Sequence, residues 1–376
     1  MDGETAPNPP GDNLMEHSIN TQLTTNQTAP KDRTTASLSA WITFFYVLLL
    51  AALLASLHWV GERNWVLSIL LYLPGYLFFL PLAVLTPICL YSRPKLCFWH
   101  LGCVFFTLFF YQTFRWSPAH APKGATLTVL TNNIANNNNR SLRPFIQAEN
   151  PDVIAIEDAT NRAGSYARQF PDRFVEGCDQ FVLISKFPII SASAVQQPGW
   201  LGRPVAARYE ISVNGESIVI YTIHMPTPRP DFAKLRGFGL LREIFNETGN
   251  RKLRDGRSYR EAMEARIELA RQLAGRFSEE KLPFLLAGDF NMPDHGFIYH
   301  LFSSRFTDAF ANSGRGWGLT FPGFGSHEFK MPGPWLRIDY IFAGKGWKPV
   351  DCRTEPDRRS KHRAVVARLE RMGNGE

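Results

Sequence analysis

The protein has 376 residues, of which 45% are hydrophobic and 20% are charged, and its formal net charge is +7. This length exceeds that of one small domain and suffices for a membrane region followed by a sizeable soluble core. The sequence contains no Cys-x-x-Cys pair and no His-Glu-x-x-His motif, so it gives no support to a structural zinc site or a zincin-type protease.

The first 38 residues are rich in Thr, Asn, Asp and Pro and poor in large apolar side chains. Such a segment cannot bury enough apolar surface to offset the entropy lost on ordering, so we predict a disordered tail over residues 1–38. It is unlike a signal peptide, in which a basic patch leads directly into an apolar core.

Residues 39–115 contain three uncharged runs, which are Ala40–Val60, Trp65–Tyr91 and Leu96–Phe114. A helix needs roughly 20 apolar residues to cross a bilayer core, and a buried helix of a soluble protein usually keeps a polar face. We therefore predict three transmembrane helices in a multi-pass protein of the cell membrane. The third run is the shortest and contains His100 and Gln112.

The basic residues in the short connections predict the orientation of this region. Two precede the first run, two lie between the second and third, and the connection between the first and second has one, beside Glu62; in chain order they are Lys31, Arg33, Arg63, Arg93 and Lys95. Positive residues stay on the cytoplasmic side, which places everything after Phe114 outside the cytoplasm. Arg115 and Lys123 argue mildly against this orientation.

A linker at residues 116–125 leads to a soluble domain over residues 126–370. Short apolar or alternating runs predict strands at Thr126–Thr131, Asp152–Ile156, Phe181–Ser185, Arg208–Val213, Ser217–His224, Phe284–Ala287, Leu336–Phe342 and Ala364–Leu369. Asn214-Gly215 predicts a tight hairpin, and apolar residues at steps of three and four predict a helix over Tyr259–Phe277. This mixture predicts an α/β domain with mixed sheets rather than a doubly wound parallel sheet, without giving the strand order.

Polar residues lie at the ends of several predicted strands. Asp289 and Asn291 follow one strand two residues apart, a spacing that lets both point to the same side of an extended chain. His224 ends another strand, Asp339 lies within an apolar run, and His362 precedes the last strand. Taken singly, each has an ordinary explanation as a turn residue, a surface histidine or a salt-bridge partner.

In this order the motifs resemble the endonuclease/exonuclease/phosphatase superfamily, which includes deoxyribonuclease I-like nucleases, neutral sphingomyelinases and inositol-phosphate phosphatases. The motifs that carry the resemblance are Gly-Asp-Phe-Asn at 288–291, Arg-Ile-Asp-Tyr-Ile-Phe at 337–342 and Ser-x-His-Arg-x-Val-Val at 360–366. The membrane-anchored bacterial type, with a few N-terminal spans, is the most similar in organisation. The resemblance implies a four-layer sandwich in which helices flank two mixed β-sheets.

The resemblance also implies catalytic roles. Asp289 and Asn291 would orient the nucleophile and the scissile phosphate. His362 would act as general base, or as an imidazolium that contacts the phosphate, while Asp339 fixes its tautomer. His224 would donate a hydrogen bond to a phosphoryl oxygen.

A divalent cation, Mg²⁺ or Mn²⁺, would bind near Asn133 and the carboxylate of Asp158. Two departures from the family pattern concern this cation. The usual Gln-Glu pair is Glu157-Asp158 here, so either carboxylate could be the ligand. The usual Asp before the last His is Lys361, which could bind the substrate phosphate or could mark a non-catalytic protein that only binds phosphorylated ligands.

We expect hydrolysis of a phosphoester or pyrophosphate bond in a lipid or lipid-linked substrate at the outer membrane face. Basic residues cluster over 236–260 and would suit an anionic membrane surface or a nucleic acid. A nuclease is therefore the alternative, although a tethered domain is poorly placed to find nucleic acid. Cys178 and Cys352 could pair in an oxidising space, and the sequence predicts no oligomeric state.

Overall fold

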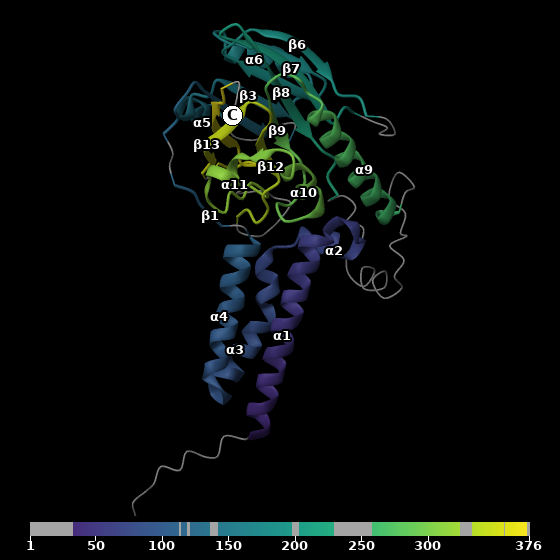
Figure 1. Cartoon of the computed structure of the whole chain (residues 1–376), viewed down its shortest axis with the longest axis vertical. Helices are drawn as coiled ribbons and strands as arrows, with labels where there is room; N and C mark the ends of the chain where they lie inside the picture. Colours follow the sequence, from purple (N-terminus) through teal and green to yellow (C-terminus); the bar gives the residue numbers. More distant parts are fainter. Residues whose placement is uncertain are drawn as a thin grey trace, which may run out of the picture.

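The structure, a computed structural model, describes residues 33–112, 114–118, 121–135, 142–197, 203–228, 258–323, 333–356 and 358–373. It consists of a helical region at one end and an α/β domain at the other (Figure 1). Most of the predicted tail, residues 1–32, lies outside the described residues. Residues 33–38 were also predicted to be disordered, but they form the start of helix α1, Arg33–Trp59.

The helical region packs α1 against α3, Leu80–Ser92, and α4, Cys97–Phe106, which continues through a π turn, η4, Thr107–Tyr111. Two helical stretches are long and apolar enough to cross a membrane, Thr34–Trp59 and Gly75–Ser92, whereas the third apolar helix, Pro94–Phe109, is shorter. A helix of that size is about 24 Å long, less than the roughly 30 Å of a bilayer core. The described chain therefore has two candidate membrane helices, and the prediction of three is wrong in number.

The run Trp65–Tyr91, predicted as one span, is divided into separate helices. After a 3-10 turn, η1, Gly61–Arg63, the Asn64 side chain caps α2, Trp65–Leu71, by accepting a hydrogen bond from the Val66 N–H at 2.9 Å. A short connection that contains Pro74 follows α2. A second 3-10 turn, η2, Gly75–Phe79, then leads directly into α3. Hydropathy cannot distinguish burial in lipid from burial in protein, so the uncharged run predicts a single span where the structure has separate helices.

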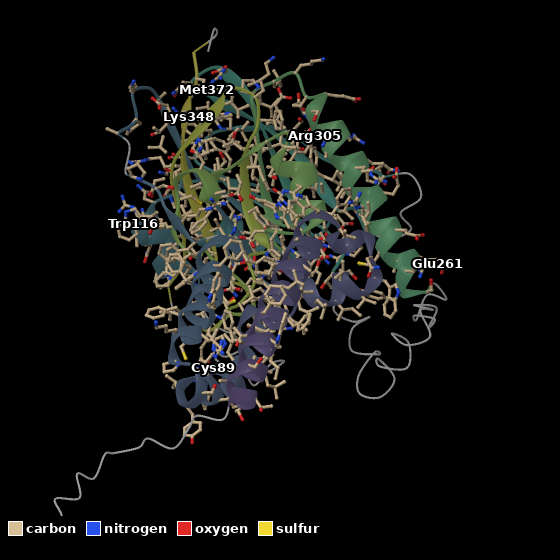
Figure 2. The ribbon with its side chains drawn as sticks, turned by 60° about the horizontal axis from the view of Figure 1, so that its bottom comes forward. Cys89, Trp116, Glu261, Arg305, Lys348 and Met372 are labelled. Carbon is tan, nitrogen blue, oxygen red and sulfur yellow. The ribbon has the colours of Figure 1, made fainter. Side chains whose placement is uncertain are left out.

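Helix α2 packs on the α/β domain. Trp65 and Ile69 form a buried cluster with Tyr259 and Met263, which belong to α9, Tyr259–Ser278. Figure 2 labels Glu261 in the first turn of α9, at the end of that helix that α2 contacts. An apolar segment that precedes α3 is thus buried against α9 of the domain.

Two six-stranded mixed sheets form the centre of the domain, with orders β13-β14-β2-β3-β5-β4 and β10-β12-β9-β8-β7-β6. The pairs β2–β3 and β8–β9 are parallel and the other pairs are antiparallel. The first sheet contains β2 Thr126–Asn133, β3 Val153–Glu157, β4 Phe174–Cys178, β5 Phe181–Ser185, β13 Trp347–Thr354 and β14 Val365–Arg371. The second contains β6 Ile189–Ala194, β7 Ala206–Val213, β8 Glu216–His224, β9 Phe284–Asp289, β10 Thr307–Asp308 and β12 Asp339–Ala343.

Three buried clusters separate four layers. One lies between the two sheets, one lies under α9 and α10, Phe297–Ser303, and one lies under α5, Arg143–Glu149, and α6, Ala163–Gln169. Helix α11, Ala309–Ser313, a 3-10 turn, η3, Pro94–Leu96, and a small ribbon of β1, Arg115–Trp116, with β11, Arg315–Gly316, complete the described elements. This arrangement confirms the predicted α/β fold with two mixed sheets flanked by helices.

Several local predictions are confirmed. The hairpin between β7 and β8 turns at Asn214 and Gly215, which have positive φ angles of 53° and 88°, as a tight turn of this type requires. Strand β5 and helix α9 match their predicted ranges to within one residue. All five cysteines are free; Cys178 and Cys352 lie in the opposite edge strands of one sheet, five strand spacings or roughly 24 Å apart.

Candidate active site

Three of the predicted site residues lie side by side on neighbouring strands of the second sheet. The strand register pairs His224 of β8 with Asp289 of β9, and Asp289 with Asp339 of β12. Gly288 makes this alignment possible, because its φ is +146° and an added Cβ would lie 2.0 Å from the Ile223 carbonyl oxygen. Only glycine fits so close to the neighbouring strand in that conformation.

The first sheet contributes the opposite wall of the site. Asn133 and Glu157 are paired at the ends of the parallel strands β2 and β3. The Asn133 side chain donates a hydrogen bond from Nδ2 to Oδ2 of Asp289 at 2.9 Å, which connects the two sheets. His362 reaches the same place from the loop before β14, the strand that pairs with β2.

His362 and Asp339 form a buried pair. Nδ1 of His362 lies 3.1 Å from each carboxylate oxygen of Asp339, and Nε2 lies 3.7 Å from Oδ2 of Asp289. Because an ionised carboxylate only accepts hydrogen bonds, Nδ1 is the protonated nitrogen of a neutral imidazole in this pair. Nε2, the basic nitrogen, is then directed towards Asp289. Thr320 supports Asp339 from behind, as its Oγ1 accepts from the Asp339 N–H at 3.3 Å.

Asp289 and Asn291 hold each other in one orientation. The Asn291 backbone N–H donates to Oδ1 of Asp289 at 2.8 Å, and its Nδ2 donates to Oδ2 at 3.1 Å. Asn291 adopts the left-handed conformation with φ of +49°, which turns the chain back towards the carboxylate. Both side chains are almost fully buried.

His224 is held by Gln180, a residue that the sequence analysis did not identify. Nδ1 of His224 lies 2.8 Å from Oε1 of Gln180, and Nε2 lies 3.4 Å from Nδ2 of Asn133. In a neutral ring that donates to Gln180, Nε2 is an acceptor. Burial lowers the pKa of His224, which favours this neutral form. Donation to a phosphoryl oxygen, as predicted, would therefore require the imidazolium or the other orientation of the Gln180 amide.

The carboxylates of the site are crowded and buried. Asp289, Asp339 and His362 offer ligand atoms that all lie within 4.8 Å of one another. Burial, together with the nearby Asp339 and Asp289, raises the pKa of Glu157 well above its usual value, although Thr131 donates to its Oε1. Burial also raises the pKa of Asp339, against the opposing effect of His362.

A divalent cation fits this donor set. Oε2 of Glu157 is buried and accepts no hydrogen bond from any residue that the structure describes. Crowded and buried carboxylates favour the binding of a positive charge, either a proton, as the raised pKa of Glu157 shows, or a cation such as Mg²⁺, which prefers oxygen ligands. Asp158 is less buried and has a φ of +55°, and its carboxylate lies 3.8 Å from the Arg203 guanidinium.

Other residues that the sequence analysis missed hold the His362 loop. Arg358 donates to Oδ1 of Asn132 at 2.9 Å and to Oε1 of Glu355 at 2.7 Å, and Oγ of Ser360 lies 2.5 Å from the His362 carbonyl oxygen. No sequence motif identifies Arg358 or Glu355, because their contacts depend on the strand order. The carbonyl of Lys361 accepts from the Gly323 N–H at 2.6 Å, and the role of its ammonium stays a prediction.

A sequence model of the endonuclease/exonuclease/phosphatase family matches residues 130–361, the part of the chain that contains the site residues described above except His362, which directly follows it. The chain belongs to the endonuclease/exonuclease/phosphatase family. This assignment confirms the resemblance drawn from the motifs. Its members are typically phosphoester hydrolases that depend on divalent metals, and the buried carboxylates of this chain agree with that chemistry.

Several solved structures are similar to this family member at low sequence identity. A humanized Danio rerio TDP2 with 14 mutations is 12% identical, with 65% of this chain and 99% of that chain covered and a TM-score of 0.46. A family protein from Leptotrichia buccalis is 16% identical over the same shares, with a TM-score of 0.45. D. rerio TDP2 complexed with a single-strand DNA product is 11% identical, again over 65% and 99%, with a TM-score of 0.47. No curated protein sequence matches this chain.

Proposed function

We propose that this protein is a membrane-anchored phosphohydrolase that requires Mg²⁺ or Mn²⁺ and cleaves a phosphoester or pyrophosphate bond of a lipid-linked substrate. Glu157, Asp289 and Asn133 are the residues that would hold the cation. We favour Glu157 over Asp158 because its Oε2, which accepts no hydrogen bond from a described residue, lies in the buried site. When bound, the cation would neutralise charge on phosphoryl oxygens and lower the pKa of a bound water.

The protein's own side chains supply the remaining chemistry. Asp339 keeps the proton of His362 on Nδ1, so Nε2 can take a proton from the attacking water as general base. The paired Asp289 and Asn291 orient groups on the reacting phosphate. Burial of these side chains excludes bulk water, which strengthens every electrostatic interaction in the site.

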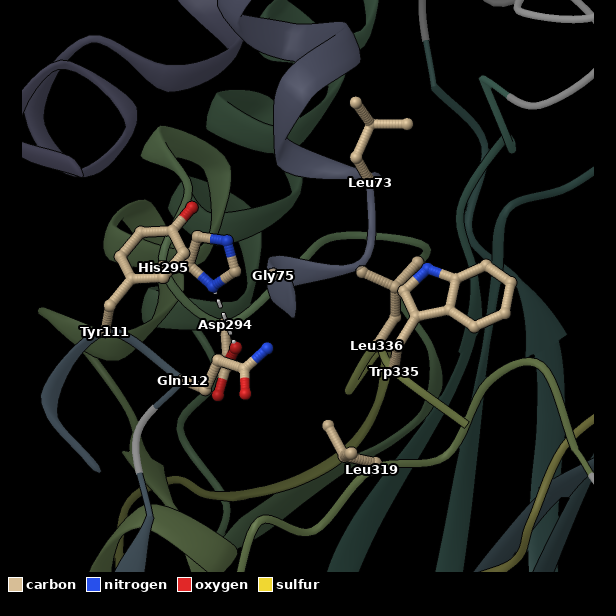
Figure 3. A pocket seen from close by; sticks show the side chains of 9 residues that line it. All are labelled: Leu73, Gly75, Tyr111, Gln112, Asp294, His295, Leu319, Trp335 and Leu336. Atoms are coloured by element: carbon tan, nitrogen blue, oxygen red, sulfur yellow. Dashed lines mark hydrogen bonds and ion pairs between the residues drawn. The ribbon is translucent and has the colours of Figure 1, made fainter. Parts of the chain in front are cut away.

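The lipid-linked substrate is proposed because the site lies close to the helical region. Phe321, whose ring centroid is 4.9 Å from that of His362, belongs to one buried cluster with Leu54 and Leu57 of α1. A small cavity near this contact is lined from both sides, by Leu73 and Tyr111 of the helical region and by residues of the domain (Figure 3). A site at this end of the domain would meet substrates at a membrane surface more readily than substrates in bulk solution.

The orientation proposal is that the domain lies outside the cytoplasm. In Figure 1 the start of α1 and the connection from α3 to α4, which contains Arg93 and Lys95, lie at the end of the helical region far from the domain. Positive residues favour the cytoplasmic side. The exposed Trp59 and Trp116 lie near the opposite end, where aromatic side chains suit a membrane interface.

The test is hydrolysis by the full chain of three substrate classes, measured as phosphate release from a polyprenyl pyrophosphate and as cleavage products from an anionic phospholipid and from a nucleic acid. We expect metal-dependent hydrolysis of a lipid substrate, with the nucleic acid turned over more slowly. Preferential cleavage of nucleic acid would instead support the nuclease. Binding of phosphorylated ligands without turnover would support the non-catalytic alternative.

A further inference from the structure

The backbone of Asn291 connects the site to the helical region. Its N–H and side chain face Asp289, whereas its carbonyl oxygen accepts a hydrogen bond from the Tyr72 hydroxyl at 2.6 Å and a second from Nη2 of Arg266. The left-handed conformation of Asn291 is uncommon for a residue other than glycine and costs free energy. It therefore persists only because the surrounding contacts determine it.

Arg266 of α9 joins the two loops that follow β8 and β9. It is 2% exposed, and it donates from Nε to the Pro226 carbonyl at 3.0 Å and from Nη1 to the Tyr72 hydroxyl at 2.8 Å. No carboxylate pairs with it among the residues that the structure describes. Its charge is thus balanced by carbonyl and hydroxyl oxygens, and such charge-assisted hydrogen bonds are stronger than neutral ones.

Tyr72 comes from the segment that directly follows α2, outside the 130–361 range of the family match. It is buried, and its own carbonyl accepts from Nε1 of Trp335 at 3.2 Å. Helix α2 holds it there, because Ser68 lies in hydrogen-bond contact with the Tyr259 hydroxyl at 2.9 Å. A side chain of the helical region therefore contacts the backbone of Asn291, the residue that orients Asp289.

We propose that Tyr72 is a positioning residue for catalysis, which acts with Arg266 by fixing the Asn291 backbone and thereby the Asp289 carboxylate. Seating of α2 on the domain then sets the geometry of the active site. The proposal rests on the proposed function for its catalytic readout, and on the hydrogen-bond geometry alone for its structural one.

Tyr72→Phe in the full chain removes only the hydroxyl. The matched control is Tyr46→Phe, because the Tyr46 hydroxyl also donates to a backbone carbonyl, that of Phe78 at 3.0 Å, within the helical region. A small misplacement of reacting groups is costly, so we expect kcat of Tyr72→Phe to fall about tenfold with little change in KM. Amide hydrogen exchange over residues 289–292 should become faster. The control should change neither.

Each outcome decides the proposal. Tyr72→Phe with kcat within about twofold of an active wild type would overturn it, as would equal losses in Tyr72→Phe and Tyr46→Phe, which would indicate a general effect on the helices. If the wild type hydrolyses none of the substrates, the proposed function fails. Hydrogen exchange then decides separately: faster exchange at 289–292 in Tyr72→Phe alone supports the positioning role, and unchanged exchange contradicts it.

Discussion

At the scale of single residues, the most consequential pair is His362 with Asp339. The two are buried together, and the carboxylate can orient the ring through Nδ1 at 3.1 Å. Arg337, two residues before Asp339, pairs instead with Asp294 at 3.2 Å and Asp308 at 2.6 Å. Asp339 itself makes its ion-pair contact with His362.

His362→Ala should lower turnover by at least ~10²-fold, the usual effect of removing a positioned acid or base. Asp339→Asn should also lower it strongly, because an amide can donate to Nδ1 and favour the other tautomer. Asp351→Asn is the control, since Asp351 is partly exposed on the edge strand β13. Steady-state kinetics of the full chain measures all three, and near-normal turnover of His362→Ala would show that another group is the base.

The resemblance drawn from the sequence implies that Lys361 stands where the family usually has an acidic residue. If its ammonium faces the site, Lys361→Asp should tighten Mn²⁺ binding, because a positive charge that competes with the cation is replaced by a possible ligand. Isothermal titration with Mn²⁺ measures the change. Unaltered affinity would show that Lys361 points away from the site, and activity gained only in the variant would identify the natural protein as a binding domain.

The placement of these residues in one site could be predicted in part from the sequence. The motifs identified Asp289, Asp339 and His362, which the structure brings together. They could not identify Gln180 or Tyr72, because each acts through a contact with a residue more than 40 positions away. Contacts of that kind depend on strand order and on how α2 packs, and a single sequence specifies neither.

At the scale of elements, patterns succeeded where a strand or helix has one clear face. The central strands β2, β3, β5 and β9 are almost wholly buried and read as apolar runs. The missed strands β4, β6 and β13 are edge strands with exposed positions, and β13 contains Pro349, which weakens a strand signal. The run Trp65–Tyr91 was wrongly predicted as one membrane span, because its apolar first part, α2, is buried against α9 and not in lipid.

Gly288→Ala tests the close approach of β8 and β9. An added methyl group would lie 2.0 Å from the Ile223 carbonyl oxygen, so we expect a loss of about 3 kcal/mol or more in the free energy of unfolding. Gly275→Ala is the matched control, since nothing lies within 4 Å of its Cβ position in α9, and it should stabilise by about 1 kcal/mol. Thermal unfolding of both variants measures the contrast, and equal midpoints would contradict the strand register.

At the scale of the whole molecule, the helical region and the domain share a core. Leu50, Leu54 and Leu57 of α1 form one buried cluster with Leu336 and Ile338, next to Asp339. The isolated domain would expose this apolar surface and would lack Tyr72. The full chain, rather than a soluble fragment, is therefore the appropriate protein for every measurement of activity.

The proposed topology predicts how intact cells respond to protease. The chain should fractionate with membranes, and protease added outside spheroplasts should cut the region after Phe114 without lysis. An antibody against the C-terminus follows the cleavage. Protection of the domain until lysis would place it in the cytoplasm, which would overturn the orientation while leaving the enzyme class unaffected.

The most direct test of the central claim is the rate of phosphate release by the full chain in liposomes that contain a polyprenyl pyrophosphate. We predict release with Mg²⁺, its abolition by a chelator, its return when Mg²⁺ is restored, and a loss of at least ~10²-fold in His362→Ala. Release that is equally fast in the chelator, or equally fast in His362→Ala, would contradict a metal-dependent hydrolase centred on this site.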